Sequence, residues 1–421
     1  GYEHAPLNNS KIVGIALEQT LVEFAQEGAD VVVFLDSTPF YAESGGQIGD
    51  QGLIETSSGH VQVHDTQKLG GRLFAHHGHV VSGVINVGDI SSAQVDVGRR
   101  SAIVRHHSAT HFLHAALRDI LGEHVQQKGS LVAEDRLRFD FSHPKPLTDD
   151  EILRIEAWVS EHILANEASV IKEMAYDEAI ASGALAFFGD KYGDQVRVVR
   201  FGDFSVELCG GIHVERAGEI GAFKIVSEGG VSAGVRRIEA VSGLRAHRVL
   251  ENQSRLINEA SGLLKIQPDE LPERIEQLLD RSRQLEKELA RLKSQAAAAA
   301  GGDLLAQVEQ IGGVAVLATE VSDLDTDGLR QMVDQLKDKM GSGVVVLGVK
   351  EEDSARLVAG VTKDLTDRIK AGDLIRHVAS GIGGKGGGRP DFAQAGGPDA
   401  SSLGTVLSEV GAWIEANIRS V

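Results

Sequence analysis

Histidine and cysteine residues at metal-ligand spacing are the clearest chemical feature of this sequence. His107 and His111 lie four residues apart in a segment with helical character, so both imidazoles project from one face of a helix. The only cysteine, Cys209, lies four residues before His213, next to glycines that permit a sharp turn. Sulfur combined with imidazole favours zinc over magnesium or calcium. These four residues therefore predict a zinc site.

The kind of zinc site is less closely defined by the sequence. Ser108 follows His107, where the zincin motif of metalloproteases requires glutamate, so a protease is not favoured. Catalytic zinc usually has three protein ligands and one position for water, whereas four protein ligands are typical of a closed structural site. Whether the zinc activates water or only positions a substrate is left open. The competing interpretations are a chance histidine pair on a surface and Cys209 as a small buried apolar side chain.

The elements that must position these residues indicate an α+β chain of several domains, because 421 residues exceed one ordinary core. Short apolar runs separated by turns predict a small β-barrel over residues 1–97. A change to helical periodicity at about residue 102, followed by mixed strands and helices, predicts an α+β domain with the zinc residues over 98–243. Its clearest helix begins at Asp149, with Thr148 as N-cap and Glu151 three residues later.

The rest of the chain predicts a helical coiled-coil segment over 244–300 and an α/β domain over 301–421. In this domain strands and helices alternate, and the last helix is expected from about 399 to 418. Leucines and an isoleucine at steps of three and four form a heptad seam over 271–292. A seam this narrow must pack against a partner helix, either 251–264 of the same chain or a second copy. The alanines and glycines of 296–302 predict a linker.

Composition limits the class of protein further. A net charge of −19 argues against broad electrostatic adhesion to nucleic acid, so any RNA contact must be local. A single cysteine excludes an intramolecular disulfide and fits the cytoplasm. No run of about 18 apolar residues is present, which argues against a membrane span. The start at Gly1 resembles neither a signal peptide nor a natural start, so we expect a longer natural chain.

Longer motifs around the zinc residues resemble the editing domain of the alanyl-tRNA synthetase family. Three stretches carry this resemblance in the family's order and with its separations: 107–111, 126–130 and 209–213. Residues 38–47 resemble the barrel that precedes editing in that family, and 383–397 resemble its carboxy-terminal domain. The family's aminoacylation domain has no counterpart in these residues.

The resemblance implies a function for each part. It implies hydrolysis of tRNA(Ala) mischarged with serine or glycine, at zinc held by His107, His111, Cys209 and His213. It also implies a carboxy-terminal domain that binds tRNA, rather than DNA, and forms a homodimer. The residues that it makes candidates for contacting the aminoacyl end are Gln127, Ser130 and Arg237 as catalytic residues, with Lys128 and Arg236 beside them. Ordinary strand, turn and salt-bridge chemistry is the competing interpretation for these residues.

Two glycine-rich motifs have more than one interpretation. Gly45-Gly46-Gln47 matches a tripeptide of peptide release factors, but the longer match around it indicates the synthetase barrel, with a tight turn beside the editing cleft. The stretch 383–389, with Lys385 and Arg389, could form a phosphate cradle or a surface loop without a ligand.

Two rival functions also remain. One is a non-catalytic tRNA-binding module whose fold is stabilised by a closed, structural zinc site. The other is a freestanding editing factor, in which no synthetase domain precedes Gly1.

Overall fold

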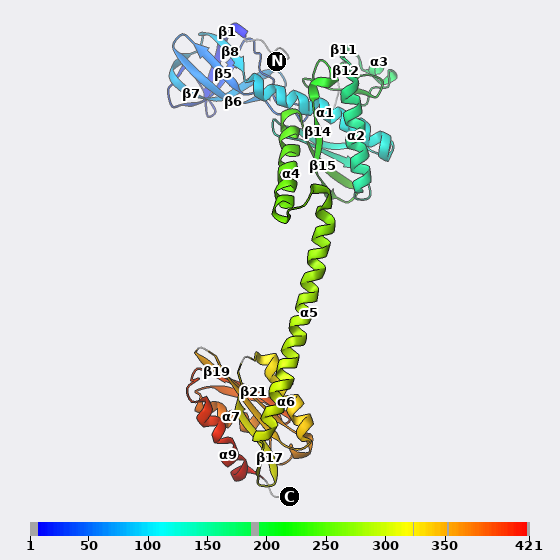
Figure 1. Ribbon diagram of the computed structural model, residues 1–421. Helices are drawn as coiled ribbons and strands as arrows, with labels where there is room; N and C mark the ends of the chain where they lie inside the picture. The colour runs from blue at the N-terminus through cyan, green and yellow to red at the C-terminus, as the bar shows by residue number, and fades with distance from the viewer. Residues whose placement is uncertain (1–6, 187–192, 323, 352, 419–421) are drawn as a thin grey trace. The chain divides into compact units, whose positions relative to one another are not determined.

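The chain folds into two compact units, Gly1–Leu263 and Leu264–Val421, each with most of its contacts inside itself (Figure 1). The structure is a computed structural model that describes residues 7–186, 193–322, 324–351 and 353–418. A barrel, three further sheets and helices of varied length confirm the α+β multidomain class predicted from the sequence. In the part of the chain that the structure describes, no helix is long and apolar enough to cross a membrane.

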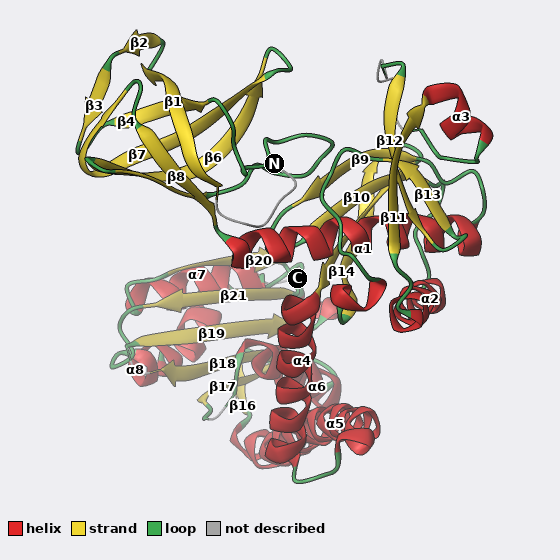
Figure 2. Cartoon of the chain, turned by 90° about the horizontal axis from the view of Figure 1, so that it is seen from above, coloured by secondary structure: helices red, strands yellow, loops and turns green. Residues whose placement is uncertain are grey.

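The first unit begins with a closed β-barrel, as predicted (Figure 2). Six strands form the ring, in the order β1 (Leu7–Leu17), β4 (Asp30–Leu35), β7 (Leu73–Asn86), β6 (Gly59–Leu69), β5 (Gly52–Thr56) and β8 (Ile90–Val95), and β8 pairs again with β1. Two short strands, β2 (Thr20–Val22) and β3 (Phe24–Gln26), pair with β1 and β7. Alternate side chains such as Ile12, Val33 and Val61 are fully buried, which gives the barrel its own core.

Helix α1 (Val97–Leu121) follows the last barrel strand directly. Asp96 caps its first turn by accepting a hydrogen bond from the Arg99 N–H. The helix begins five residues before the expected start at 102, and its middle turns are buried on every side. Such all-round burial is why its apolar stripe is weakly marked in the sequence, and it places His107 and His111 in the interior.

The sheets of the first unit surround α1 with strands from distant parts of the sequence. One antiparallel sheet has the order β14 (Phe223–Ser232), β15 (Val235–Ser242), β10 (Leu137–Ser142) and β9 (Gln127–Val132). The other consists of β11 (Ser169–Ala175), β12 (Gln195–Phe201) and β13 (Ser205–Leu208). Helices α2 (Asp149–Ala165), α3 (Tyr176–Ala181) and α4 (Gly243–Leu264) complete the unit. Thr148 and Glu151 form the capping box predicted at the start of α2.

The second unit contains a six-stranded sheet covered on both faces, in agreement with the predicted α/β domain. Its strands are β16 (Glu309–Ile311), β17 (Val314–Glu320), β18 (Val344–Glu351), β19 (Ser354–Val361), β21 (Phe392–Gly397) and β20 (Lys385–Arg389), in that spatial order. Helix α6 (Thr326–Met340) connects the parallel pair β17 and β18 and packs on one face. The other face holds α7 (Ala371–Gly381), α8 (Leu403–Ser408) and α9 (Val410–Asn417).

Three features of the second unit differ from expectation. Helix α5 (Leu271–Leu304) includes the alanines and glycines predicted as a linker, because alanine is the strongest helix former and Leu304 at the helix end is buried in the core beside α6. The expected single helix from 399 to 418 is divided into α8 and α9. The glycine-rich stretch is an edge strand, β20, rather than a loop, because its backbone pairs with β21.

Candidate metal centre

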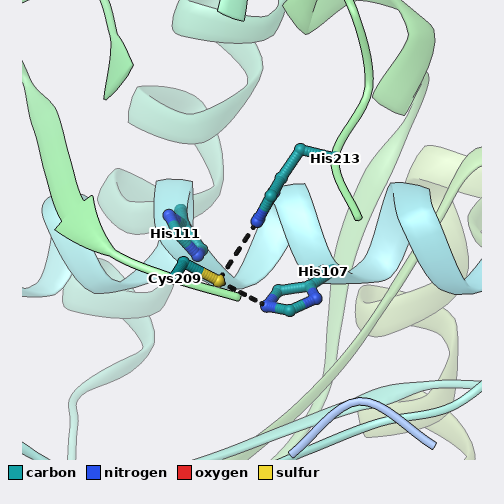
Figure 3. Close-up of side chains that lie close together, drawn as sticks. All are labelled: His107, His111, Cys209 and His213. Atoms are coloured by element: carbon teal, nitrogen blue, oxygen red, sulfur yellow. Dashed lines mark hydrogen bonds between the residues drawn. The ribbon is translucent and has the colours of Figure 1, made fainter. Parts of the chain in front are cut away.

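Four side chains from two separate parts of the first unit meet at one point (Figure 3). His107 and His111 come from successive turns of α1, Cys209 follows β13, and His213 lies four residues further on. Their candidate ligand atoms all lie within 4.8 Å of one another. The Sγ of Cys209 lies 3.3 Å from His107 Nε2 and 3.3 Å from His213 Nε2. The structure therefore brings together all four predicted ligands.

These separations suit a tetrahedral zinc ion. Zinc binds thiolate sulfur at about 2.3 Å and imidazole nitrogen at about 2.0–2.1 Å, so two ligand atoms on one ion lie roughly 3.5 Å apart. The observed sulfur–nitrogen distances are close to that value. One sulfur and three imidazoles are also a donor set that zinc prefers over harder cations.

Each histidine of the cluster has a polar group close to its Nδ1. Nδ1 of His107 lies 2.7 Å from Gln47 Oε1, and Nδ1 of His213 lies 3.2 Å from Ser108 Oγ, both with hydrogen-bond geometry. Nδ1 of His111 lies 3.1 Å from Glu207 Oε2, but this contact does not have hydrogen-bond geometry. Such partners are typical of metal-binding histidines, because they fix the ring orientation and the tautomer. Hydrogen-bond partners on two of the rings, with a carboxylate beside the third, favour a metal site over a chance cluster of histidines.

Burial controls the protonation of the cluster. It lowers the pKa of His107 and of His213 well below the usual value, so both rings stay neutral, as metal ligands must be. Burial raises the pKa of the Cys209 thiol to about 12. At neutral pH, Cys209 without a metal would therefore be a thiol rather than a nucleophilic thiolate. A metal ion supplies the charge that a buried thiolate needs, which argues for Cys209 as a ligand.

Two charged residues support the cluster from outside. Glu207, which is buried, lies 2.9 Å from His114 Nδ1 in addition to its contact with His111. Burial would raise the pKa of Glu207, but the two histidines outweigh this effect and lower it, so the group remains a carboxylate. Arg197 donates from Nη1 to the carbonyl oxygens of Cys209 and Gly211, each at 2.8 Å, and so holds the loop that carries the sulfur.

A pocket of about 500 Å³ opens directly beside the cluster. Three of the four candidate ligands line it, together with hydroxyl, amide and ammonium groups. The lining residues are Ser44, Gly45, Gly46, His107, Thr110, His111, Gln127, Lys128, Gly129, Ser130, Val132, Glu207, Leu208, Cys209 and Gly210. A volume of this size accommodates a small-molecule group, and its polar groups could orient an ester next to a metal.

The predicted catalytic residues lie at different positions relative to this pocket. Gln127 and Ser130 line it from strand β9, and Gln127 Nε2 donates to Ser130 Oγ over 3.1 Å. Arg237 on β15 pairs through two nitrogens with Asp140 of β10, at 2.7 and 2.8 Å, and does not belong to the described lining. Asp140 in turn faces Gly129 across the strands. A direct role of Arg237 therefore stays a prediction.

The flanking candidates also differ from one another. Lys128 lines the pocket, whereas Arg236 forms a bidentate pair with Glu228 at 2.5 and 2.7 Å. The surroundings of Arg236 therefore match the competing interpretation, in which this residue forms an ordinary salt bridge.

Sequence reasoning missed several residues of the site. Ser108 directly follows His107, and Glu207 lies two residues before Cys209, but no spacing rule marks either as a neighbour of a histidine nitrogen. Thr110 lies within the first histidine pair and lines the pocket. In the sequence, Gln47 is visible only as part of a glycine-rich turn motif. Sixty residues separate it from His107, so only the folded chain brings the two together.

Family models match three parts of the chain. The model described as tRNA synthetases class II (A) matches residues 1–99. The threonyl and alanyl tRNA synthetase second additional domain matches residues 196–239, which include Cys209 and His213. The DHHA1 domain matches residues 313–416 in the second unit.

Curated relatives match almost the whole chain. Alanine–tRNA ligases of Burkholderia mallei (strain NCTC 10229), Burkholderia pseudomallei (strain K96243) and Burkholderia thailandensis are each 49% identical over 418 residues. These matches cover 99% of this chain and 48% of each relative, so the chain spans about half the length of these proteins. A crystal structure of the C-Ala domain from Aquifex aeolicus alanyl-tRNA synthetase is 26% identical, covers 26% of this chain and 97% of its own, and has a TM-score of 0.25.

Proposed function

Because this chain belongs to the alanyl-tRNA synthetase family, we propose that its metal cluster and the adjoining pocket hydrolyse tRNA(Ala) mischarged with serine or glycine. The observation that carries the proposal is the position of three candidate ligands in the wall of a polar pocket. A metal site that only stapled the fold would not need to border such a pocket. The match of residues 196–239 to the second additional domain gives independent support.

The residues present fit zinc, which His107, His111, Cys209 and His213 would hold. When bound, zinc supplies Lewis-acid polarisation and orientation of the substrate. In the hydrolysis, a water oxygen attacks the carbonyl carbon of the aminoacyl ester, the bond to the ribose oxygen breaks, and a proton passes to that oxygen. The products are the free amino acid and tRNA with its hydroxyl restored.

The chain's own groups would bind and orient this ester. Lys128 brings positive charge to the pocket, where it suits the RNA end, and Gln127 and Ser130 offer amide and hydroxyl groups on β9. Thr110 Oγ1 donates to the His106 carbonyl over 2.8 Å, so its lone pairs remain to accept from a serine hydroxyl. An alanyl ester has no hydroxyl for this contact, so the contact favours the seryl ester over the alanyl ester. A glycyl ester also lacks the hydroxyl, so this contact accounts for the selection of serine and not of glycine.

The direct test is deacylation of seryl-, glycyl- and alanyl-tRNA(Ala), with and without a zinc chelator. We expect hydrolysis of the seryl and glycyl esters, little hydrolysis of the alanyl ester, and loss of activity after chelation that added zinc restores. Equal hydrolysis of all three esters would contradict the selectivity. Full activity after verified removal of the metal would contradict its role in the reaction.

A second candidate function is a non-catalytic tRNA-binding module with structural zinc. Four protein ligands favour it, since closed four-ligand sites are typical of structural zinc. The same assay separates the two functions, because a purely structural site would leave all three esters intact while metal removal unfolds the domain.

The second unit would bind tRNA in either case. Strand β20 carries Lys385 and Arg389 at its two ends, with three glycines between them that leave the backbone accessible. Lys385 and Arg356 also border a pocket of about 350 Å³ beside the start of α6. Cationic side chains next to bare backbone suit the phosphates of RNA.

Self-association through α5 would complete the proposed assembly. The apolar seam side chains of α5 after Leu271 are exposed, with Leu285 at 61% and Leu289 at 56% of their accessible area. We expect the wild-type protein to sediment as a dimer, because each leucine gains about 1.5–3 kcal/mol when a partner helix buries it. Replacing both leucines by aspartate should give a monomer, whereas Gln284→Asp on the same helix should not. A strict wild-type monomer at high concentration would favour packing against 251–264 within one chain.

A further inference from the structure

Gln47 links the barrel to the metal cluster. It lies in the connection between barrel strands β4 and β5, yet its side chain is fully buried. Its Oε1 lies 2.7 Å from His107 Nδ1 and accepts the Ile212 N–H over 3.1 Å. We propose that Gln47 is a positioning residue, which holds His107 in the tautomer that presents Nε2 to the metal. The proposal rests on the metal site of the proposed function.

The hydrogen bonds determine the orientation of both groups. An amide oxygen and nitrogen are normally hard to distinguish, and so are the two tautomers of histidine. Here the backbone N–H of Ile212 can only donate, so the amide atom that faces it must be the oxygen. Because this oxygen also faces His107, Nδ1 must carry the ring proton. Nε2 is then unprotonated, and it is the nitrogen that lies 3.3 Å from Cys209 Sγ.

Local backbone structure holds Gln47 in place. Ser44 and Gln47 exchange two backbone hydrogen bonds around Gly45 and Gly46, whose φ angles of +59° and +83° favour glycine. The Val132 N–H of β9 donates to the Gly46 carbonyl over 2.7 Å, and the Val132 carbonyl accepts from the Ile48 N–H over 3.2 Å. A Cβ on Gly46 would lie 2.4 Å from Ser130 Oγ. The tight turn expected at this motif is thus present, and it anchors Gln47 to the strand that carries Gln127 and Ser130.

The other side of the imidazole is equally close to backbone. A Cβ on Gly211 would lie 1.9 Å from His107 Cε1, so only glycine permits the ring position that Gln47 defines. His111 and His213 obtain their partners, Glu207 and Ser108, from the elements around α1. Of the three partners, Gln47 alone comes from the barrel region. The barrel would therefore contribute directly to metal binding, in addition to any contact with RNA.

The test compares metal binding by three variants of the full chain. Gln47→Leu removes the hydrogen-bond acceptor at similar side-chain volume, and Gln47→Glu keeps an acceptor at the same position. Gln62→Leu is the control, because it replaces another barrel glutamine by leucine. The amide of Gln62 donates to the Gly52 carbonyl. Zinc affinity is measured by competition with a chromophoric chelator, and the ligand field by the visible spectrum of bound Co²⁺. We expect Gln47→Leu to bind zinc about 10–100-fold more weakly, the usual effect of losing such a partner, with an altered Co²⁺ spectrum. Gln47→Glu and Gln62→Leu should retain wild-type affinity and spectrum.

Wild-type affinity and spectrum in Gln47→Leu would overturn the proposal. If circular dichroism shows that Gln47→Leu does not fold, zinc binding by Gln47→Glu becomes the test of the proposal. Tight zinc binding by Gln47→Glu supports the role of the acceptor, and weak zinc binding by a folded Gln47→Glu overturns it. Deacylation is measured on the same samples. A wild-type protein that binds zinc in the expected way but leaves seryl-tRNA intact would count against the hydrolase alone, so the two failures are distinguishable.

Discussion

Replacing Cys209 and His213 together by alanine should lower the rate of seryl-tRNA(Ala) deacylation by about a thousandfold. The double variant removes two of the four candidate ligands, including the only thiolate donor, so zinc is no longer retained. Loss of a metal that polarises or orients the ester costs several kcal/mol of transition-state stabilisation, and about 1.4 kcal/mol corresponds to a factor of ten in rate. The measurement is release of labelled serine from tRNA, with zinc content determined on the same protein.

A matched variant controls for the loss of two side chains. His124 and His143 form another close pair in the same unit, with His124 Nε2 2.9 Å from His143 Nδ1, and neither lines the pocket as described. Replacing both by alanine should leave zinc content and deacylation close to the wild type. Unchanged hydrolysis by a folded, metal-free Cys209→Ala/His213→Ala protein would contradict the role of zinc. Equal losses in both double variants would indicate a general effect on the fold.

Periodic and local signals predicted much of the fold. The barrel, the start of α2 and the strand–helix alternation of the second unit all follow from spacing, turn residues and caps that act within about ten residues. Errors arose where tertiary contacts override local preference. Gly301 and Gly302 indicate that a helix ends before them, but the burial of Leu304 in the core of the second unit keeps both glycines in α5. Three consecutive glycines indicate a loop, but pairing with β21 makes them a strand.

At the site, too, local sequence signals predicted the candidate metal ligands but not the residues that contact their ring nitrogens. His107, His111, Cys209 and His213 were predictable because two i,i+4 pairs and a lone cysteine are visible in sequence. Their partners were not, since glutamine, glutamate and serine are common residues and the separation of Gln47 from His107 follows no short-range rule. The family resemblance makes Arg236 and Arg237 candidates for substrate contact, yet each faces a carboxylate on the sheet. Sequence alone gives the charge of such residues but not the partner that neutralises it.

Arg100→Met should destabilise the first unit by about 3–5 kcal/mol, the usual cost of leaving one member of a buried ion pair unpaired. Arg100 and Asp50 are each about 1% exposed, and Arg100 binds Asp50 Oδ2 through Nε at 3.0 Å and also through Nη2. Nη2 further donates to the Pro39 carbonyl over 2.6 Å. Methionine would fill part of the volume but would remove the guanidinium donors from the Asp50 carboxylate, which also accepts from the Tyr41 N–H at 2.6 Å. Urea unfolding followed by circular dichroism measures the change.

Two comparisons separate charge from packing in this prediction. The double variant Arg100→Met/Asp50→Leu should recover most of the lost stability, because apolar side chains can replace a buried ion pair at little cost. Arg200→Met, which breaks an exposed pair with Asp203, should change stability by less than about 1 kcal/mol. Wild-type stability in Arg100→Met would contradict the argument. Asp50 lies three residues after Gln47, so loss of the Arg100–Asp50 ion pair should also weaken zinc binding. Weaker zinc binding by Arg100→Met would show that the junction of the barrel and α1 supports the metal site as well as the fold.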